Sequence, residues 1–122
     1  AWKKTLKITL KVGDYYKVFD FCDIAYLQAD GSYTKVVMVS KKEKSLTLTM
    51  TLKVISCYLE DSFFRIHRSH IVNLDHVSRI CGNRVEMCTG ELLDVGLPYK
   101  KLLWDILNVV ALGKRYEERR NL

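Results

Sequence analysis

The sequence lacks the features that mark membrane, secreted and zinc-binding proteins. Its 122 residues contain no apolar run long enough to cross a bilayer, and Ala1-Trp2-Lys3-Lys4 does not begin a signal peptide. No two of its four cysteines (Cys22, Cys57, Cys81 and Cys88) have CxxC spacing. We therefore expect a cytoplasmic protein with four free thiols, and we predict that Cys57 and Cys81, which lie in apolar sequence, are core residues.

A catalytic site and a metal site are also missing from the sequence. Ser69 lies between His67 and His70 with Asp75 nearby, but no nucleophile elbow and no Gly-rich loop accompanies them. The His67-x-x-His70 pair would have to bend to chelate a metal, and no second tight ligand pair follows it. We therefore expect neither an enzyme nor a metal or other cofactor.

The charge of the chain is positive. Twenty Lys and Arg residues stand against fourteen Asp and Glu residues, which gives a formal net charge of +6. Every basic residue in the first 60 positions is Lys, whereas most of the later ones are Arg. Because the Arg fork suits phosphate oxygens and guanine edges, the second half is the better place for a surface that reads a polyanion.

Alternating apolar residues predict a β-rich first half. Leu6, Ile8, Leu10 and Val12 occupy one face of an expected strand, and turn signals follow at Gly13-Asp14 and Asp30-Gly31. Further strands are expected over residues 15–20, 23–28, 33–40 and 45–50. A short helix is then expected over residues 52–59, with Thr49 or Thr51 as its N-cap.

The second half repeats this pattern. Extended structure is expected over residues 64–67, a turn or single helical turn over 69–74, and strands over 76–80, 84–88 and 91–95. Pro98 opens a helix whose apolar stripe runs from Leu102 to Val110, and Gly113 ends it. The predicted fold class is mainly β, with antiparallel hairpins and two short helices in a single domain over residues 1–122 that ends in a charged tail, 113–122.

The stretch from Phe63 to Asn73, FFRIHRSHIVN, mixes polar and apolar side chains in an unusual way. Arg68 and Asn73 carry groups that can pair with guanine and adenine edges, and His67, Ser69 and His70 can reach bases or phosphates. The alternative interpretation is a structural corner, in which His67 is a core histidine and Asn73 caps a turn. Residue chemistry alone leaves both open.

Three other segments allow two interpretations each. Tyr33, Thr34 and Lys35 form either a second binding patch or an exposed strand start. The lysines Lys41, Lys42 and Lys44 form either a solvated hairpin tip or phosphate contacts. The stripe from Leu102 to Leu112 serves either the core or a dimer contact.

At FFRIHRSHIVNLDHV (residues 63–77) the sequence closely resembles the LytTR family of bacterial DNA-binding domains. The segments DIAYLQADGSYTKVVM (23–38) and RVEMCTGELLDVGLPYKKLL (84–103) extend the resemblance over a core of about residues 17–107. The resemblance implies an elongated antiparallel β fold whose loops, rather than a recognition helix, enter successive major grooves of DNA. It also implies the output domain of a two-component response regulator.

The family's DNA contacts map onto this chain by position. The first contact loop falls on Ser32, Tyr33, Thr34 and Lys35, and the second on His67, Arg68 and Ser69. The resemblance therefore implies base reading by Tyr33, Thr34, Lys35, His67 and Arg68, and phosphate contact by Ser69. Asn73 is expected to hold the turn that presents Arg68. Lys41 and Lys42, and Lys100 and Lys101 at the start of the last helix, are further expected phosphate contacts.

The third contact departs from the family pattern. Family members usually have Ser-Arg before the closing helix, whereas this chain has Gly96-Leu97. Either Lys100 or Lys101 substitutes as a phosphate clamp, or base reading at that end is reduced, and Leu97 could touch a thymine methyl group. The departure favours one alternative to DNA binding, namely a protein-interaction module on the same scaffold.

The implied partners are double-stranded DNA with paired direct repeats in promoters, a second copy of the protein on that DNA, and a cognate histidine kinase. The kinase would act through an N-terminal receiver domain. Since the chain begins at Ala1 and not at Met, we expect it to be part of a longer protein whose receiver domain precedes it.

Overall fold

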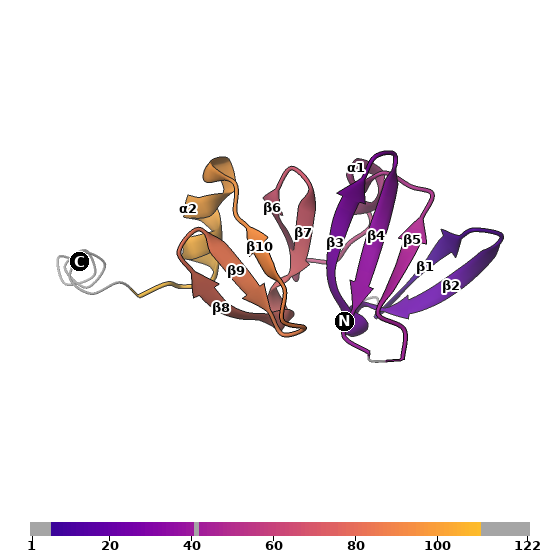
Figure 1. Cartoon of the computed structure of the whole chain (residues 1–122), viewed down its shortest axis with the longest axis horizontal. Helices are drawn as coiled ribbons and strands as arrows, with labels where there is room; N and C mark the ends of the chain where they lie inside the picture. Colours follow the sequence, from indigo (N-terminus) through magenta and orange to yellow (C-terminus); the bar gives the residue numbers. More distant parts are fainter. Residues whose placement is uncertain (1–5, 41, 111–122) are drawn as a thin grey trace, which may run out of the picture.

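The computed structural model describes residues 6–40 and 42–110, and in this part the chain is built mainly of β-strands (Figure 1). Besides two short 3-10 helices, Phe21–Asp23 (η1) and Leu74–His76 (η2), it has two α-helices, α1 (Leu52–Ser56) and α2 (Leu97–Ile106). The strands are β1 (Lys7–Val12), β2 (Tyr15–Asp20), β3 (Ile24–Asp30), β4 (Tyr33–Met38), β5 (Ser45–Leu48), β6 (Phe63–His67), β7 (His70–Asn73), β8 (Val77–Cys81), β9 (Arg84–Met87) and β10 (Leu92–Asp94). The predicted fold class is confirmed.

Three antiparallel sheets follow one another along the long axis of the molecule (Figure 1). The β1–β2 hairpin lies at one end, a five-stranded sheet with the order β5-β4-β3-β7-β6 lies in the middle, and β10-β9-β8 lies with α2 at the other end. The middle sheet thus lies between the β1–β2 hairpin and the sheet of β8, β9 and β10.

The middle sheet is buried on both faces. Neighbouring residues of a strand point to opposite faces, so Leu27 and Ile71 pack in one core cluster with α1 and the β1–β2 hairpin, whereas Tyr26 and Val72 pack in a second. The second cluster includes Val85 from β9 and Leu103 from α2. Burial on both faces explains why β3 begins with four buried apolar residues (IAYL) and β4 ends with three (VVM).

The turn or single helical turn predicted over residues 69–74 is wrong. Residues His70–Asn73 form β7, which pairs with β6 and also with β3, where Tyr26 lies opposite Val72. Only Leu74–His76 form a helical turn. The partner strand β3 lies more than 40 residues away in the sequence, and local patterns do not report such a pairing.

Both helices are shorter than predicted. The Thr51 hydroxyl accepts a hydrogen bond from the Val54 amide at 3.3 Å, which confirms this N-cap, but α1 ends at Ser56. Helix α2 ends because Asn108 has a positive φ of 54° and the Val109 amide donates to the Trp104 carbonyl at 3.0 Å, which together form a Schellman cap. The predicted end at Gly113 and the charged tail lie outside the described residues.

The prediction that Cys57 and Cys81 are core residues is also wrong. All four cysteines are free thiols on the surface. Cys57 directly follows the early end of α1, and Cys81 ends β8 at the turn to β9, so neither position faces a core cluster.

Candidate nucleic-acid interface

Two hairpin tips lie next to each other at one edge of the middle sheet. The β3–β4 turn contains Gly31 with a φ of 60°, and the β6–β7 turn contains Arg68 and Ser69. Strand β3 pairs with β7, and the Ala29 amide donates to the Ser69 carbonyl at 2.9 Å. Figure 1 shows both tips at the upper edge, where α2 also begins. The fold thus gathers all three sequence-predicted contact regions on one side of the molecule. These regions are the β3–β4 tip, the β6–β7 tip and the start of α2, and together they form the expected contact edge.

Arg68 lies at the tip of the β6–β7 turn and is exposed. Its guanidinium has no hydrogen bond or ion pair with any residue that the structure describes. The His67 ring is half-buried, and its Nδ1 accepts a hydrogen bond from the Ser69 amide at 3.1 Å. In the neutral ring the proton is then on Nε2, which leaves a donor that can face a ligand.

The first loop presents two of its predicted reading residues and hides the third. Tyr33 is 49% exposed and Lys35 is exposed on the same side of β4. Thr34 points the other way, is 0% exposed, and donates its hydroxyl proton to the Met50 carbonyl at 2.7 Å. A buried hydroxyl cannot reach a base, so the expected base-reading role of Thr34 does not fit this structure. Thr34 instead joins β4 to the segment before α1.

Replacing Thr34 with valine is expected to lower the free energy of unfolding by about 1–2 kcal/mol, because the Met50 carbonyl loses its buried donor. Urea denaturation measures the change. The matched control is Thr47→Val on β5, an exposed position where the expected change is within about 0.5 kcal/mol. Equal effects at the two positions would show that the Thr34 hydrogen bond contributes nothing.

Asn73 is buried at the end of β7 that lies away from Arg68. Its Nδ2 donates to the carbonyls of Phe21 and Ile24 at 3.3 and 3.0 Å, and its Oδ1 accepts from the Asp75 amide at 3.1 Å. These bonds join β7 to η1 and cap η2. Asn73 therefore supports the sheet that carries the β6–β7 turn, whereas the turn itself is held by other groups.

Sequence reasoning missed Arg65, which makes the closest side-chain contact with that turn. Its Nη2 donates to the Arg68 carbonyl at 2.6 Å, and its Nε donates to the His67 carbonyl at 3.3 Å. The only available sequence signal is the position of Arg65 three residues before Arg68 in an extended segment.

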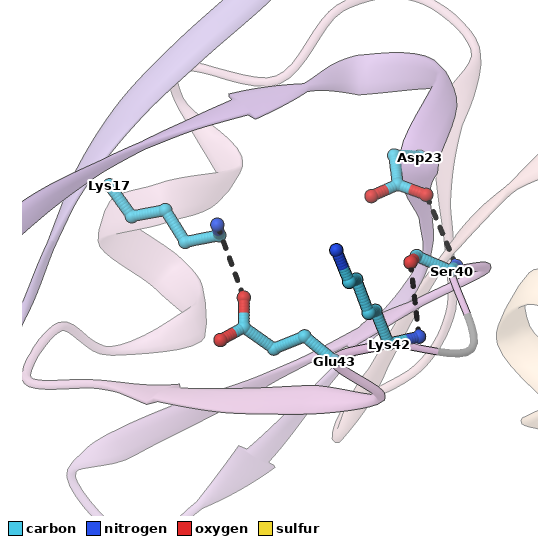
Figure 2. Close-up of polar contacts among 5 residues, drawn as sticks. All are labelled: Lys17, Asp23, Ser40, Lys42 and Glu43. Carbon is cyan, nitrogen blue, oxygen red and sulfur yellow. Dashed lines mark hydrogen bonds and ion pairs between the residues drawn. The ribbon is translucent and has the colours of Figure 1, made fainter.

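The expected phosphate contact of Lys42 does not fit the structure, and Lys41 lies outside the described residues. Lys42 follows the end of β4 that lies opposite Tyr33. At the rise per residue of a strand, the two ends of β4 are roughly 17 Å apart. Figure 2 shows its side chain pointing between Asp23 and the Lys17–Glu43 ion pair of 3.1 Å. Two cations and two carboxylates share this small pocket, and such a balance does not select a phosphate.

The start of α2 lies close to the β6–β7 turn. The Gly96 amide donates to the Ile66 carbonyl at 2.7 Å, one residue before His67. Leu97 is 83% exposed. Lys100 donates to Asn83 Oδ1 at 2.7 Å and lies 5.6 Å from the centre of the Trp104 ring. Lys101 is exposed and has no such contact with the residues that the structure describes. Lys101 is therefore more available to a ligand than Lys100.

His70 is the first residue of β7, directly after the turn, and is half-buried. Its Nδ1 is buried without a hydrogen-bond partner among the described residues, and the His67 ring centre lies 5.6 Å away. Burial, and next the His67 ring, lower the pKa of His70 below its ordinary value of 6.5, while Asp94 opposes the shift. Burial and the Glu91 carboxylate raise the pKa of the neighbouring Tyr26 to about 12, so its phenol stays neutral.

The lowered pKa predicts a loss of stability in acid. As the pH falls below 6.5, the unfolded chain protonates His70 before the folded protein does, so the free energy of unfolding decreases. The contribution is at most about 1.4 kcal/mol per pH unit, and partial exposure reduces it. Urea denaturation between pH 7.5 and 5.5 should show a shallower decrease for His70→Gln than for the wild type. A steeper decrease in the variant would contradict the assignment.

Among the described residues, no group of three or more His, Cys, Asp or Glu side chains could hold a metal ion. His76 contacts the Cys22 carbonyl at 2.6 Å and Cys88 Sγ at 3.5 Å, and so lies apart from His67 and His70. None of the helices in the described ranges has the length and apolar character needed to cross a membrane.

Comparison with known proteins gives the same family that the sequence resembles. The model of the LytTr DNA-binding domain matches residues 14–108. The sensory transduction protein LytT of Bacillus subtilis (strain 168) is 31% identical over 109 residues, which cover 84% of this chain and 44% of LytT. The chain therefore spans less than half the length of that relative.

A solved structure agrees with this match. The LytTr DNA-binding domain of a methyl-accepting/DNA response regulator from Bacillus cereus is 28% identical, with a TM-score of 0.71. The match covers 87% of this chain and 100% of that one. Since the family model matches residues 14–108, most of the length of the chain, this chain belongs to the LytTR family of DNA-binding domains.

Proposed function

We propose that this domain binds promoter DNA in a sequence-specific way, as the output domain of a bacterial response regulator. One observation carries the proposal. The β3–β4 tip, the β6–β7 tip and the start of α2 lie at one edge (Figure 1). The β6–β7 tip carries Arg68, whose exposed guanidinium has no bonding partner among the described residues. A row of projecting loops suits the successive major grooves on one side of a duplex.

In the proposed mechanism, phosphate contacts position the domain and base contacts select the sequence. Arg68 pairs with the O6 and N7 acceptors of a guanine, for which its planar fork is the best-suited side chain. His67 Nε2 and Ser69 lie beside it, and Tyr33 and Lys35 act from the neighbouring tip. Thr34 has no part in this mechanism because it is buried.

The start of α2 makes a different kind of contact. Lys101 is exposed and suits a phosphate, whereas Lys100 would first have to leave Asn83 and the Trp104 ring. Leu97 cannot form a charge-assisted bond, but its exposed side chain can pack against the methyl group of a thymine. This end of the surface therefore contributes apolar and phosphate contacts in place of a second Arg.

The context of the domain is proposed from its relatives. LytT, of which this chain matches 44%, is described as a sensory transduction protein, and the Bacillus cereus structure as part of a response regulator. By analogy, a receiver domain precedes this domain, and a histidine kinase phosphorylates that receiver in the bacterial cytoplasm. Two copies then occupy paired direct repeats, and the domain has no catalytic step of its own.

A protein-interaction module is the second candidate, and Leu97 is the observation that favours it. A leucine with 83% exposure at the expected contact edge would also suit an apolar protein partner.

A salt titration of binding to a random-sequence duplex separates the two candidates. DNA binding predicts measurable affinity at low salt and a steep decrease of log K with log salt concentration, with a slope of about −0.9 for each phosphate neutralised. The absence of measurable affinity even at low salt would reject DNA binding and favour the interaction module.

A further inference from the structure

The Arg65 guanidinium contacts the backbone of the β6–β7 turn. Arg65 belongs to β6, opposite Ile71 on β7, and is only partly exposed. Its Nη2 donates to the Arg68 carbonyl at 2.6 Å and its Nε donates to the His67 carbonyl at 3.3 Å. One planar group thus binds two consecutive carbonyls of the turn that carries the proposed base reader.

Two further backbone groups of this turn also have hydrogen-bond partners. The Ser69 amide donates to His67 Nδ1 at 3.1 Å, and the Ser69 carbonyl accepts from the Ala29 amide of the adjacent hairpin at 2.9 Å. Four backbone groups in three successive residues therefore have fixed partners, and Arg65 supplies two of those partners. A turn held in this way loses little conformational freedom when it binds a ligand.

We propose that Arg65 is a positioning residue, which fixes the β6–β7 turn and so directs Arg68 toward DNA without touching DNA itself. The inference rests on the proposed function, since it assigns Arg68 the reading role. It differs from the simplest expectation for an arginine near a DNA surface, which is a phosphate contact. The geometry favours positioning because the donors on the Nε edge already face backbone carbonyls.

Arg65→Lys separates the two roles because it keeps the charge and loses the fork. A lysine ammonium is a point charge on a flexible stem and does not reproduce the paired Nε and Nη2 donors. Positioning predicts about tenfold weaker binding of the preferred duplex, with an unchanged salt slope. A phosphate contact predicts near-wild-type affinity for Arg65→Lys, and a salt slope that is reduced by about 1 in Arg65→Gln. This second result would overturn the proposal.

Arg79→Lys is the matched control. Arg79 is an exposed arginine on β8 that bonds Glu86 with the same two nitrogens, Nε at 3.0 Å and Nη2 at 2.7 Å, but it lies outside the contact edge. The Arg79→Lys variant should bind the preferred duplex with the affinity of the wild type. An equal loss in Arg79→Lys and Arg65→Lys would mean that the effect is not specific to the turn, and would also overturn the proposal.

Amide hydrogen exchange in the free protein tests the same inference without DNA. Arg65→Lys is expected to speed exchange of the Ser69 amide at least several-fold, while the Val72 amide in the centre of the sheet is unchanged. Unchanged exchange at Ser69, or an equal increase at both amides, would refute the role of Arg65 in the turn. If the wild type binds no DNA, the proposed function fails, and the exchange data still decide whether Arg65 fixes the turn.

Discussion

Replacing Arg68 with alanine is expected to weaken binding to the preferred duplex by about 1–3 kcal/mol, the value of one bidentate contact to guanine. The same change should remove the base preference at one position of the site. The Arg68 side chain is exposed and has no partner within the described ranges of the chain, so its loss should leave the fold and its stability intact. Fluorescence anisotropy with cognate and scrambled duplexes measures the difference.

Arg79→Ala is the matched control for this experiment. It also removes one exposed arginine, and so one positive charge, but from a side chain that already bonds Glu86 on the sheet of β8 and β9. Base preference should be unchanged in this variant. If Arg68→Ala lowered binding to cognate and scrambled DNA equally, Arg68 would be a phosphate contact and not a base reader.

Replacing Asn73 with alanine is expected to lower the free energy of unfolding by about 2–4 kcal/mol, which is the second large effect. The side chain is 1% exposed and makes three hydrogen bonds to backbone groups of Phe21, Ile24 and Asp75. Alanine leaves two carbonyls and one amide without these partners, and each buried polar group that loses its partner costs about 1–3 kcal/mol before relaxation. Urea denaturation and the thermal midpoint measure the loss.

Asn83→Ala is a suitable control for Asn73→Ala. Asn83 is exposed in the β8–β9 turn, and within the described part of the chain its side chain has one hydrogen bond, which it accepts from Lys100. The expected change is within about 0.5 kcal/mol. Asn73→Asp should be destabilised like Asn73→Ala, since a carboxylate cannot donate to the Phe21 and Ile24 carbonyls. A stable Asn73→Asp protein would show that these two bonds are not what Asn73 provides.

The elements that the sequence predicted correctly are those encoded by local signals. The hairpins at Gly31 and Gly82 form because both glycines take a positive φ, and Thr51 caps α1 as its position before an apolar segment suggested. The Arg68 turn was found through the resemblance of residues 63–77 to a known family, and the structure places it at an exposed tip.

The features that sequence reasoning missed depend on contacts between distant segments. Strand β7 pairs with the distant β3 as well as with its neighbour β6, and the buried Thr34 bonds the carbonyl of Met50, which lies 16 residues further along the chain. Lys42 was grouped with the other basic residues by charge alone, but the length of β4 separates it from the contact edge. Arg65 carries no local signal that distinguishes a residue that positions the turn from one that contacts phosphate.

Selection of bound sequences from a pool of randomised duplexes tests the central claim most directly. The wild-type domain should enrich a defined sequence with a preferred guanine. Arg68→Ala should enrich the same sequence without a base preference at the position of that guanine. The contradicting result would be a pool that stays random after repeated selection with the wild type, at a salt concentration where the protein still binds duplex DNA.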